Sequence, residues 1–118
     1  MKKIGQILRT TEFESSSEKT QQFKIFVSEF KKEMKKEMKI IDATNIEFSI
    51  GHFDITGFFD YKGELYYFSL SDIRGSNYNS TFSLLYRTAK HRKDWTGGSN
   101  QWVIIDENMG KKMFNLAH

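Results

Sequence analysis

Residues 53–71 read FDITGFFDYKGELYYFSLS, and this stretch is the strongest indicator of the fold in the sequence. It holds two apolar runs, Phe53–Tyr61 and Glu64–Ser71, which are rich in the aromatic and β-branched residues typical of strands. Asp60-Tyr-Lys-Gly63 joins the runs through a polar tip that ends in glycine, as a tight hairpin turn requires. The stretch therefore predicts an antiparallel β-hairpin.

The chain before this hairpin predicts a third strand and a long helix. Residues 45–50 alternate polar and apolar side chains, which is typical of a half-buried strand. Further upstream, Ser15 and Glu18 form a capping-box pattern, and apolar residues then recur at steps of three and four. This stripe consists of Phe23, Phe26, Val27, Phe30, Met34 and Met38. We expect a helix over residues 17–39, packed on one face of a three-stranded meander.

The remaining segments complete an α+β fold. Residues 5–13 alternate loosely and predict a strand. Residues 79–90 fit both periodicities, and the N-cap candidates in residues 75–80 favour a short helix over a strand. Trp102–Asp106 and Lys112–Leu116 predict a closing hairpin. The expected fold is an antiparallel sheet, made of the central meander and the C-terminal hairpin, with one long amphipathic helix on one face and a second short helix.

One face of the predicted hairpin is more apolar than a solvated face should be. The side chains responsible are Phe58, Tyr66, Phe68 and Leu70. Either the C-terminal part of the chain covers this face, or the face contacts a protein partner or a second copy of the chain.

Composition limits the class of protein. A chain of 118 residues fits one domain, residues 1–118, with room for a core. The absence of cysteine excludes disulfides and thiolate metal sites. The sequence has neither a signal peptide nor an apolar run of about 18 residues, the length that spans a membrane. We therefore expect a cytoplasmic protein that has no membrane contact, no metal and no cofactor.

Charge and aromatic residues concentrate in residues 86–102, YRTAKHRKDWTGGSNQW, here named the basic-aromatic segment. Residues 74–102 hold five basic side chains and one acidic, whereas residues 44–73 hold one basic and five acidic. Cations that alternate with flat rings suit a phosphate backbone and its bases. The segment therefore favours a nucleic-acid-binding surface.

Each residue type in and near this segment has an expected role. Phosphate contacts are expected from Arg74, Arg87, Lys90, Arg92 and Lys93, and base stacking from Tyr86, Trp95 and Trp102. Asn100 and Gln101 are expected to donate and accept hydrogen bonds. Residues 96–100 are expected to form a loop whose backbone N–H groups face an anion. The competing interpretation places both tryptophans in the core.

Two stretches also resemble a group of known proteins. Residues 67–74, YFSLSDIR, and residues 85–100, with Leu85-Tyr-Arg-Thr-Ala-Lys-His91 and Asp94-Trp-Thr-Gly-Gly-Ser-Asn100, resemble small uncharacterised accessory proteins of conjugative transposons and plasmids in Gram-positive bacteria. The resemblance implies a cytoplasmic protein in a setting where DNA is processed and transferred. It implies no activity.

The sequence thus favours a small non-enzymatic module that binds single-stranded or weakly sequence-specific DNA or RNA. The alternative is a protein-interaction or homo-oligomerising subunit that uses the apolar sheet face. A third hypothesis is an acid/base nuclease, with His52 or His91 as the titrating group and Asp54 or Asp94 as its carboxylate partner.

Overall fold

The computed structural model describes residues 1–10, 17–51, 54–70, 83–95 and 97–116. Arg74, one of the expected phosphate contacts, lies outside these ranges. The described elements are, in order, α1 (Lys2–Thr10), α2 (Ser17–Ile40), β1 (Thr44–Ile50), β2 (Ile55–Tyr61), β3 (Glu64–Leu70), β4 (Ser83–Thr88), β5 (Gln101–Ile104) and α3 (Met109–Met113).

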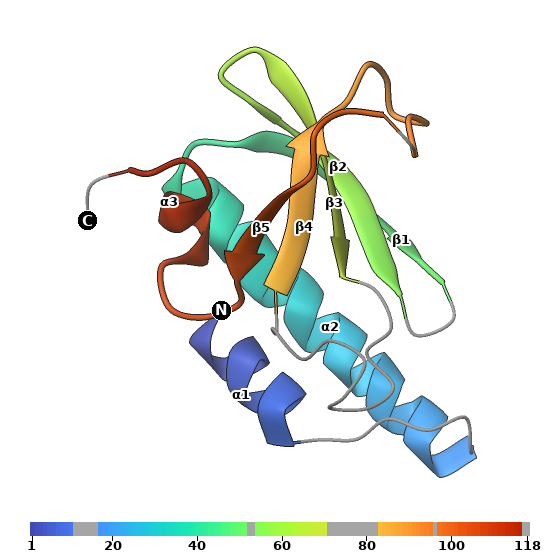
Figure 1. Cartoon of the computed structure of the whole chain (residues 1–118). Helices are drawn as coiled ribbons and strands as arrows, with labels where there is room; N and C mark the ends of the chain where they lie inside the picture. The colour runs from blue at the N-terminus through green and yellow to red at the C-terminus, as the bar shows by residue number, and fades with distance from the viewer. Residues whose placement is uncertain (11–16, 52–53, 71–82, 96, 117–118) are drawn as a thin grey trace.

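The five strands form one antiparallel sheet, in which each strand pairs with the next along the chain. Helix α2 crosses behind the sheet in Figure 1, with α1 packed against it and α3 beside β5. We call the side of the sheet that faces away from α2 the open face. This architecture confirms the predicted α+β class. No helix among the described residues has the length and apolarity needed to cross a membrane.

The predicted long helix is confirmed, and it supplies one layer of the core. All six residues of its apolar stripe are buried. They pack against the side chains that β2, β3 and β4 direct toward the helix, among them Phe59, Phe68 and Leu84. Because large aromatic side chains fill both layers, burial of apolar area is the main stabilising term of this fold.

The hairpin is confirmed as well. Strands β2 and β3 pair over their full length, and both turn residues, Lys62 and Gly63, have positive φ angles of 49° and 80°. Positive φ at both positions matches the right-handed twist of the flanking strands. Glycine adopts it without steric cost, and lysine adopts it at a modest one.

The expected apolar outer face of this hairpin is wrong in three of its four residues. Tyr66, Phe68 and Leu70 face α2 and belong to or pack against the core, and Leu70 and Phe68 are fully buried. Only Phe58 lies on the open face, where it is 3% exposed. Alternate side chains of a strand point to opposite faces of the sheet. A wrong assignment of the face for one residue therefore also misplaces the residues two and four positions away.

Two further predictions are wrong at the ends of the chain. Residues 5–10 belong to helix α1 rather than to a strand, and residues 11–13 lie outside the described ranges. The helix forms because Met1, Ile4 and Leu8 are spaced three and four apart and bury against the core. Lys112 and Met113 end helix α3, so the predicted closing hairpin does not form.

The ambiguous segment is a strand where the structure describes it. Residues 83–88 form β4, between β3 and β5, rather than a short helix. Pairing on both sides satisfies the backbone groups of this strand. Leu84 and Tyr86 face the core, while Leu85 faces the open side. Tertiary pairing therefore overrides the helical periodicity of the segment.

Candidate functional site

The register between β4 and β5 divides the basic-aromatic segment between two faces of the sheet. Leu85 pairs with Trp102, and both side chains lie on the open face. Tyr86 pairs with Gln101, and both lie on the side of the helices. Residues that are adjacent in sequence therefore do not form one continuous binding surface.

Tyr86 is a core residue. It is 8% exposed, and its hydroxyl donates a 2.7 Å hydrogen bond to the backbone oxygen of Met113. Burial raises its pKa, with a smaller contribution from the charge of Tyr66, so the hydroxyl stays protonated at neutral pH. The expected role of Tyr86 in base stacking is wrong, because its ring is enclosed by the protein.

Arg87 is also buried, with a side chain that is 2% exposed. Its Nη2 donates to the backbone oxygen of Asp94 at 2.6 Å, and its Nη1 donates to that of Thr88 at 3.1 Å. The guanidinium also lies 4.4 Å from the ring centre of Tyr67. Its donors are thus used within the chain, and the expected phosphate contact of Arg87 is wrong.

The loop after β4 contains its own anion. The carboxylate of Asp94 accepts hydrogen bonds from the backbone N–H groups of Lys90 and Gly97, each at 3.0 Å. It also lies 3.7 Å from Nη1 of Arg87. An internal carboxylate therefore occupies the position that the sequence suggested for an external anion.

Arg92 connects the same loop to strands β1 and β2. Its guanidinium forms ion pairs with Glu47 at 2.7 Å and Asp60 at 2.9 Å, and it donates to the backbone oxygen of Asn45 at 2.9 Å. These partners belong to β1 and β2. Arg92 therefore fixes residues 89–95 across the open face, which leaves less of its charge for a ligand.

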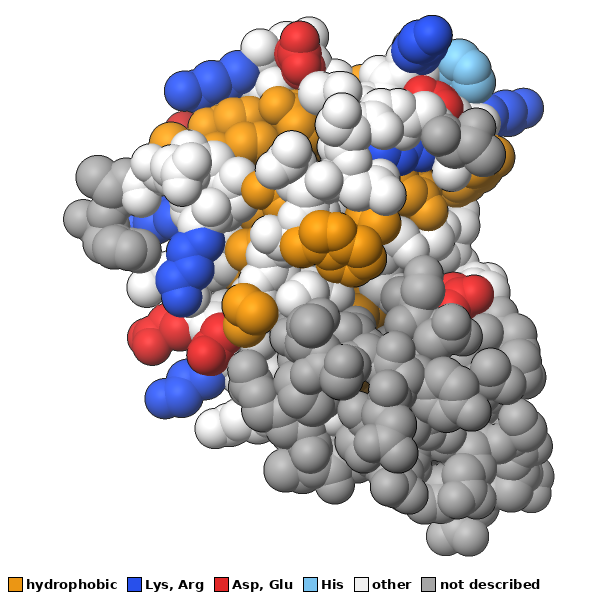
Figure 2. Space-filling view, in the orientation of Figure 1, with side chains coloured by type: hydrophobic (Ala, Val, Ile, Leu, Met, Phe, Trp, Pro, Cys, Tyr) orange, Lys and Arg blue, Asp and Glu red, His pale blue; other side chains and the backbone are white. Residues whose placement is uncertain are grey.

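Trp95 and Trp102 stay accessible on the open face, at 50% and 61% exposure. Trp95 covers Phe58 and Tyr67, with ring centres 5.2 and 6.0 Å away. Trp102 has no ring contact with any described residue. Apolar side chains lie across the middle of this face in Figure 2, and Lys or Arg side chains flank the histidine at one end. The prediction that the tryptophans fill the core is wrong for both.

Two lysines of the segment remain available. Lys90 and Lys93 are exposed, and no carboxylate of the described residues lies within ion-pair distance of either ammonium group. Asn100, further along the segment, is also exposed. Of the ten expected nucleic-acid contacts, the structure therefore keeps these three residues and the two tryptophans accessible at or near the open face.

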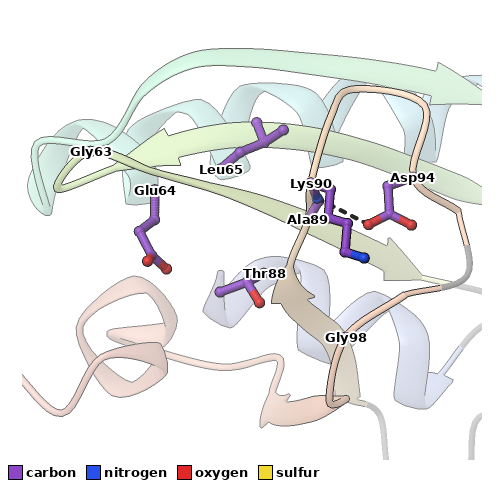
Figure 3. A pocket seen from close by; sticks show the side chains of 8 residues that line it. All are labelled: Gly63, Glu64, Leu65, Thr88, Ala89, Lys90, Asp94 and Gly98. Atoms are coloured by element: carbon purple, nitrogen blue, oxygen red, sulfur yellow. Dashed lines mark hydrogen bonds between the residues drawn. The ribbon is translucent and has the colours of Figure 1, made fainter.

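Two hollows lie on either side of Thr88 and Gly98. The first, of about 510 Å³, is bounded by the β2–β3 turn and the loop after β4, and Figure 3 shows Glu64 and Asp94 facing it along with Lys90. With two carboxylates against one ammonium group, the interior of this hollow does not favour a phosphate, although Lys90 itself is exposed to solvent.

The second hollow, of about 520 Å³, lies on the helix side of the sheet, and we call it the tyrosine groove. Its lining residues include Tyr66, Tyr86, Ser99, Gln101, Phe114 and Asn115. Sequence reasoning missed this site because its walls come from β3, β4, β5 and the end of α3. No local motif joins them.

Glycine is required where the loop crosses β4. Gly98 has a φ of 82°, and a Cβ atom there would lie 2.7 Å from the backbone oxygen of Thr88. A side chain at this position would push the loop away from the strand and alter both hollows.

The nuclease hypothesis gains no assembled site. His52 lies outside the described residues, and His91 is exposed, with its Nδ1 accepting a 3.2 Å hydrogen bond from the N–H of Lys93. Asp94 is bound within its loop. Within the described ranges, no three His, Asp or Glu side chains gather as a metal site requires.

Comparison with protein-family models, with curated proteins and with solved structures found no significant match for this chain. The candidate site is therefore argued from its own geometry.

Proposed function

We propose that this protein binds single-stranded nucleic acid on the open face of its sheet. The observation that carries the proposal is the pair of accessible rings, Trp95 and Trp102, on one sheet face near lysines that have no carboxylate partner among the described residues. Exposed indole rings are unusual on a protein surface and are enriched where a flat partner binds.

The rings are far enough apart to hold two separate bases of one strand. Trp95 lies over β2 and β3, and Trp102 projects from β5, two strands further on. Two strand spacings amount to about 10 Å. Single-stranded nucleic acids commonly bind sheets in this way, with bases on aromatic rings and phosphates on nearby cations. Lys90 and Lys93 supply those cations.

Replacement of Trp102 by alanine is expected to weaken binding of a labelled single-stranded oligonucleotide about tenfold or more, since stacking contributes about 1–3 kcal/mol per base. Fluorescence anisotropy at low and moderate salt measures this affinity. Ile104→Ala is the matched control, because Ile104 is 48% exposed on the same face of the same strand but has no ring.

Charge reversal separates specific contacts from net charge. The variant Lys90→Glu/Lys93→Glu is expected to lose most of the affinity and to show a smaller salt dependence. Lys35→Glu/Lys39→Glu changes the net charge equally on the exposed side of α2. Equal losses in the two double variants, or no salt-dependent binding by the unaltered protein, would contradict the proposal.

A second candidate function is pairing of two copies through β5. This strand lies at the edge of the described sheet, and its residues Gln-Trp-Val-Ile contain neither a charge nor a proline. Natural edge strands commonly carry charged residues or proline, which prevent pairing between chains. Antiparallel pairing about a two-fold axis would place Trp102 of one copy near Ile104 of the other.

If β5 pairs in this way, Ile104→Lys is expected to convert a dimer to a monomer in sedimentation velocity at micromolar concentration. Ile40→Lys is the control, because Ile40 is 57% exposed on α2 rather than on the sheet. A protein that sediments as a monomer at all accessible concentrations excludes this second function.

A further inference from the structure

The tyrosine groove has the size and walls of a small-molecule site. Its volume of about 520 Å³ lies within the range of ligand pockets, about 300–1,000 Å³. Phe114 and Tyr66, which are half-buried, form an apolar wall, and their ring centres lie 5.1 Å apart in an edge-to-face arrangement. Phe114 is itself held in place by stacking on Tyr61 at 4.0 Å.

Several polar groups in this groove have no partner within the described chain. Gln101 and Asn115 present side-chain amides, and Ser99 presents a hydroxyl, each on an exposed residue. An amide supplies both donors and an acceptor, which is the pattern that the edge of a nucleobase also presents. Tyr66 adds a hydroxyl that burial keeps protonated, because desolvation raises its pKa, with a smaller contribution from Glu64.

The charge of the groove selects against ionic ligands. Arg87 is the one charged residue in its described lining, and its guanidinium is already bonded to the backbone oxygens of Thr88 and Asp94. The lining otherwise offers rings, amides and hydroxyls. It therefore fits a flat, uncharged molecule with hydrogen-bonding edges.

We propose that the tyrosine groove binds an uncharged nucleobase ring, with the ring against Phe114 and Tyr66 and its polar edge on Gln101 and Asn115. The groove lies on the opposite side of the sheet from Trp102, so this binding does not depend on the open face.

Titration of the ¹⁵N-labelled full chain with adenosine and with uridine tests the proposal. At least one nucleoside is expected to cause saturable shifts in the amide signals of Ser99, Gln101 and Asn115. Gln101→Ala and Asn115→Gly are expected to weaken that binding fivefold or more. Glycine is chosen for Asn115 because its φ of 54° suits glycine.

Asn108→Gly is the matched control for Asn115→Gly, because Asn108 is also exposed, has a φ of 60° and does not line the groove. It is expected to leave the affinity unchanged, and ribose 5-phosphate, which lacks a base, is expected to cause no shifts at the groove. The proposal is overturned if neither nucleoside shifts these signals, or if Asn108→Gly weakens binding as much as Asn115→Gly.

A parallel titration with an oligoadenylate tests whether the groove takes a base within a strand or only a free nucleoside. Shifts at the groove with both adenosine and the oligomer show that a base within a strand enters it, and shifts with adenosine alone show that the groove accepts a free nucleoside but not a base within a strand. The nucleoside titration is independent of the proposed binding at the open face, because a nucleoside carries no phosphate for Lys90 and Lys93 to bind. If oligonucleotides do not bind the open face, the shifts at the tyrosine groove still test this proposal.

Discussion

Replacement of Arg87 by methionine is expected to lower the free energy of unfolding by about 3 kcal/mol or more. Methionine retains much of the apolar volume but removes the donors to the backbone oxygens of Thr88 and Asp94. Hydrogen bonds to a charged group contribute about 1.5–3 kcal/mol each, and the Asp94 carboxylate would also lose its nearby cation. Urea denaturation followed by circular dichroism measures the change.

Arg92→Met is the matched control for this prediction. Arg92 is also an arginine with carboxylate partners, and it has two of them. Its side chain, however, is 29% exposed, and the partner side chains are 61% and 35% exposed. Solvent screening limits such pairs to about 1 kcal/mol or less. If the two variants lose equal stability, burial of the guanidinium is not what makes Arg87 important. Arg87→Lys, which retains charge without the forked donors, is expected to fall between them.

A methyl group at Gly57 is expected to destabilise the fold by about 3 kcal/mol or more, at or beyond the upper end of ordinary overpacking. Gly57 lies in β2, paired with Phe48 on one side and Phe68 on the other. A Cβ atom there would collide with the backbone oxygen of Glu47, and it would lie 2.5 and 2.7 Å from two ring carbons of Phe68. Backbone in the middle of a sheet has little room to move.

Gly51→Ala is the control for Gly57→Ala. Its Cβ atom would meet the Asp54 side chain at 3.6 Å, which is ordinary contact, so stability is expected to change by about 0.5 kcal/mol or less. Thermal melting of both variants measures the difference. Similar melting temperatures for Gly57→Ala and the unaltered protein would contradict the close packing of Phe68 over the strand.

The parts of the fold that the sequence predicted are those with a long, regular pattern. The stripe of α2 recurs over about four turns, and the β2–β3 hairpin carries both its strand composition and its turn residues within one short stretch. Short elements lacked such a signal. Helix α1 has nine residues, so the helical spacing of Met1, Ile4 and Leu8 covers only about two turns, and α3 has five residues. Both short helices pack against α2.

The candidate site was harder to predict because the pairing of the strands places residues that are neighbours in sequence on opposite faces of the sheet. Arg87 and Trp102 belong to the same basic-aromatic segment, yet the first is 3% exposed and the second 61%. The difference arises from Asp94 and Tyr67, which enclose the guanidinium from a loop and a neighbouring strand. The side-chain types were enough to predict candidate residues. Which of them are accessible depends on the face of the sheet where each residue lies and on the neighbours that enclose it.

The strand order has a consequence for how the chain folds. Because every strand pairs with its neighbour in sequence, the sheet can grow one hairpin at a time without a long crossover. Local pairing of this kind lowers the contact order, and low contact order accompanies fast folding. The β2–β3 hairpin, with its two-residue turn, is a suitable nucleus. We expect β1 and β4 to pair next on the two edges of this hairpin, and β5 to follow.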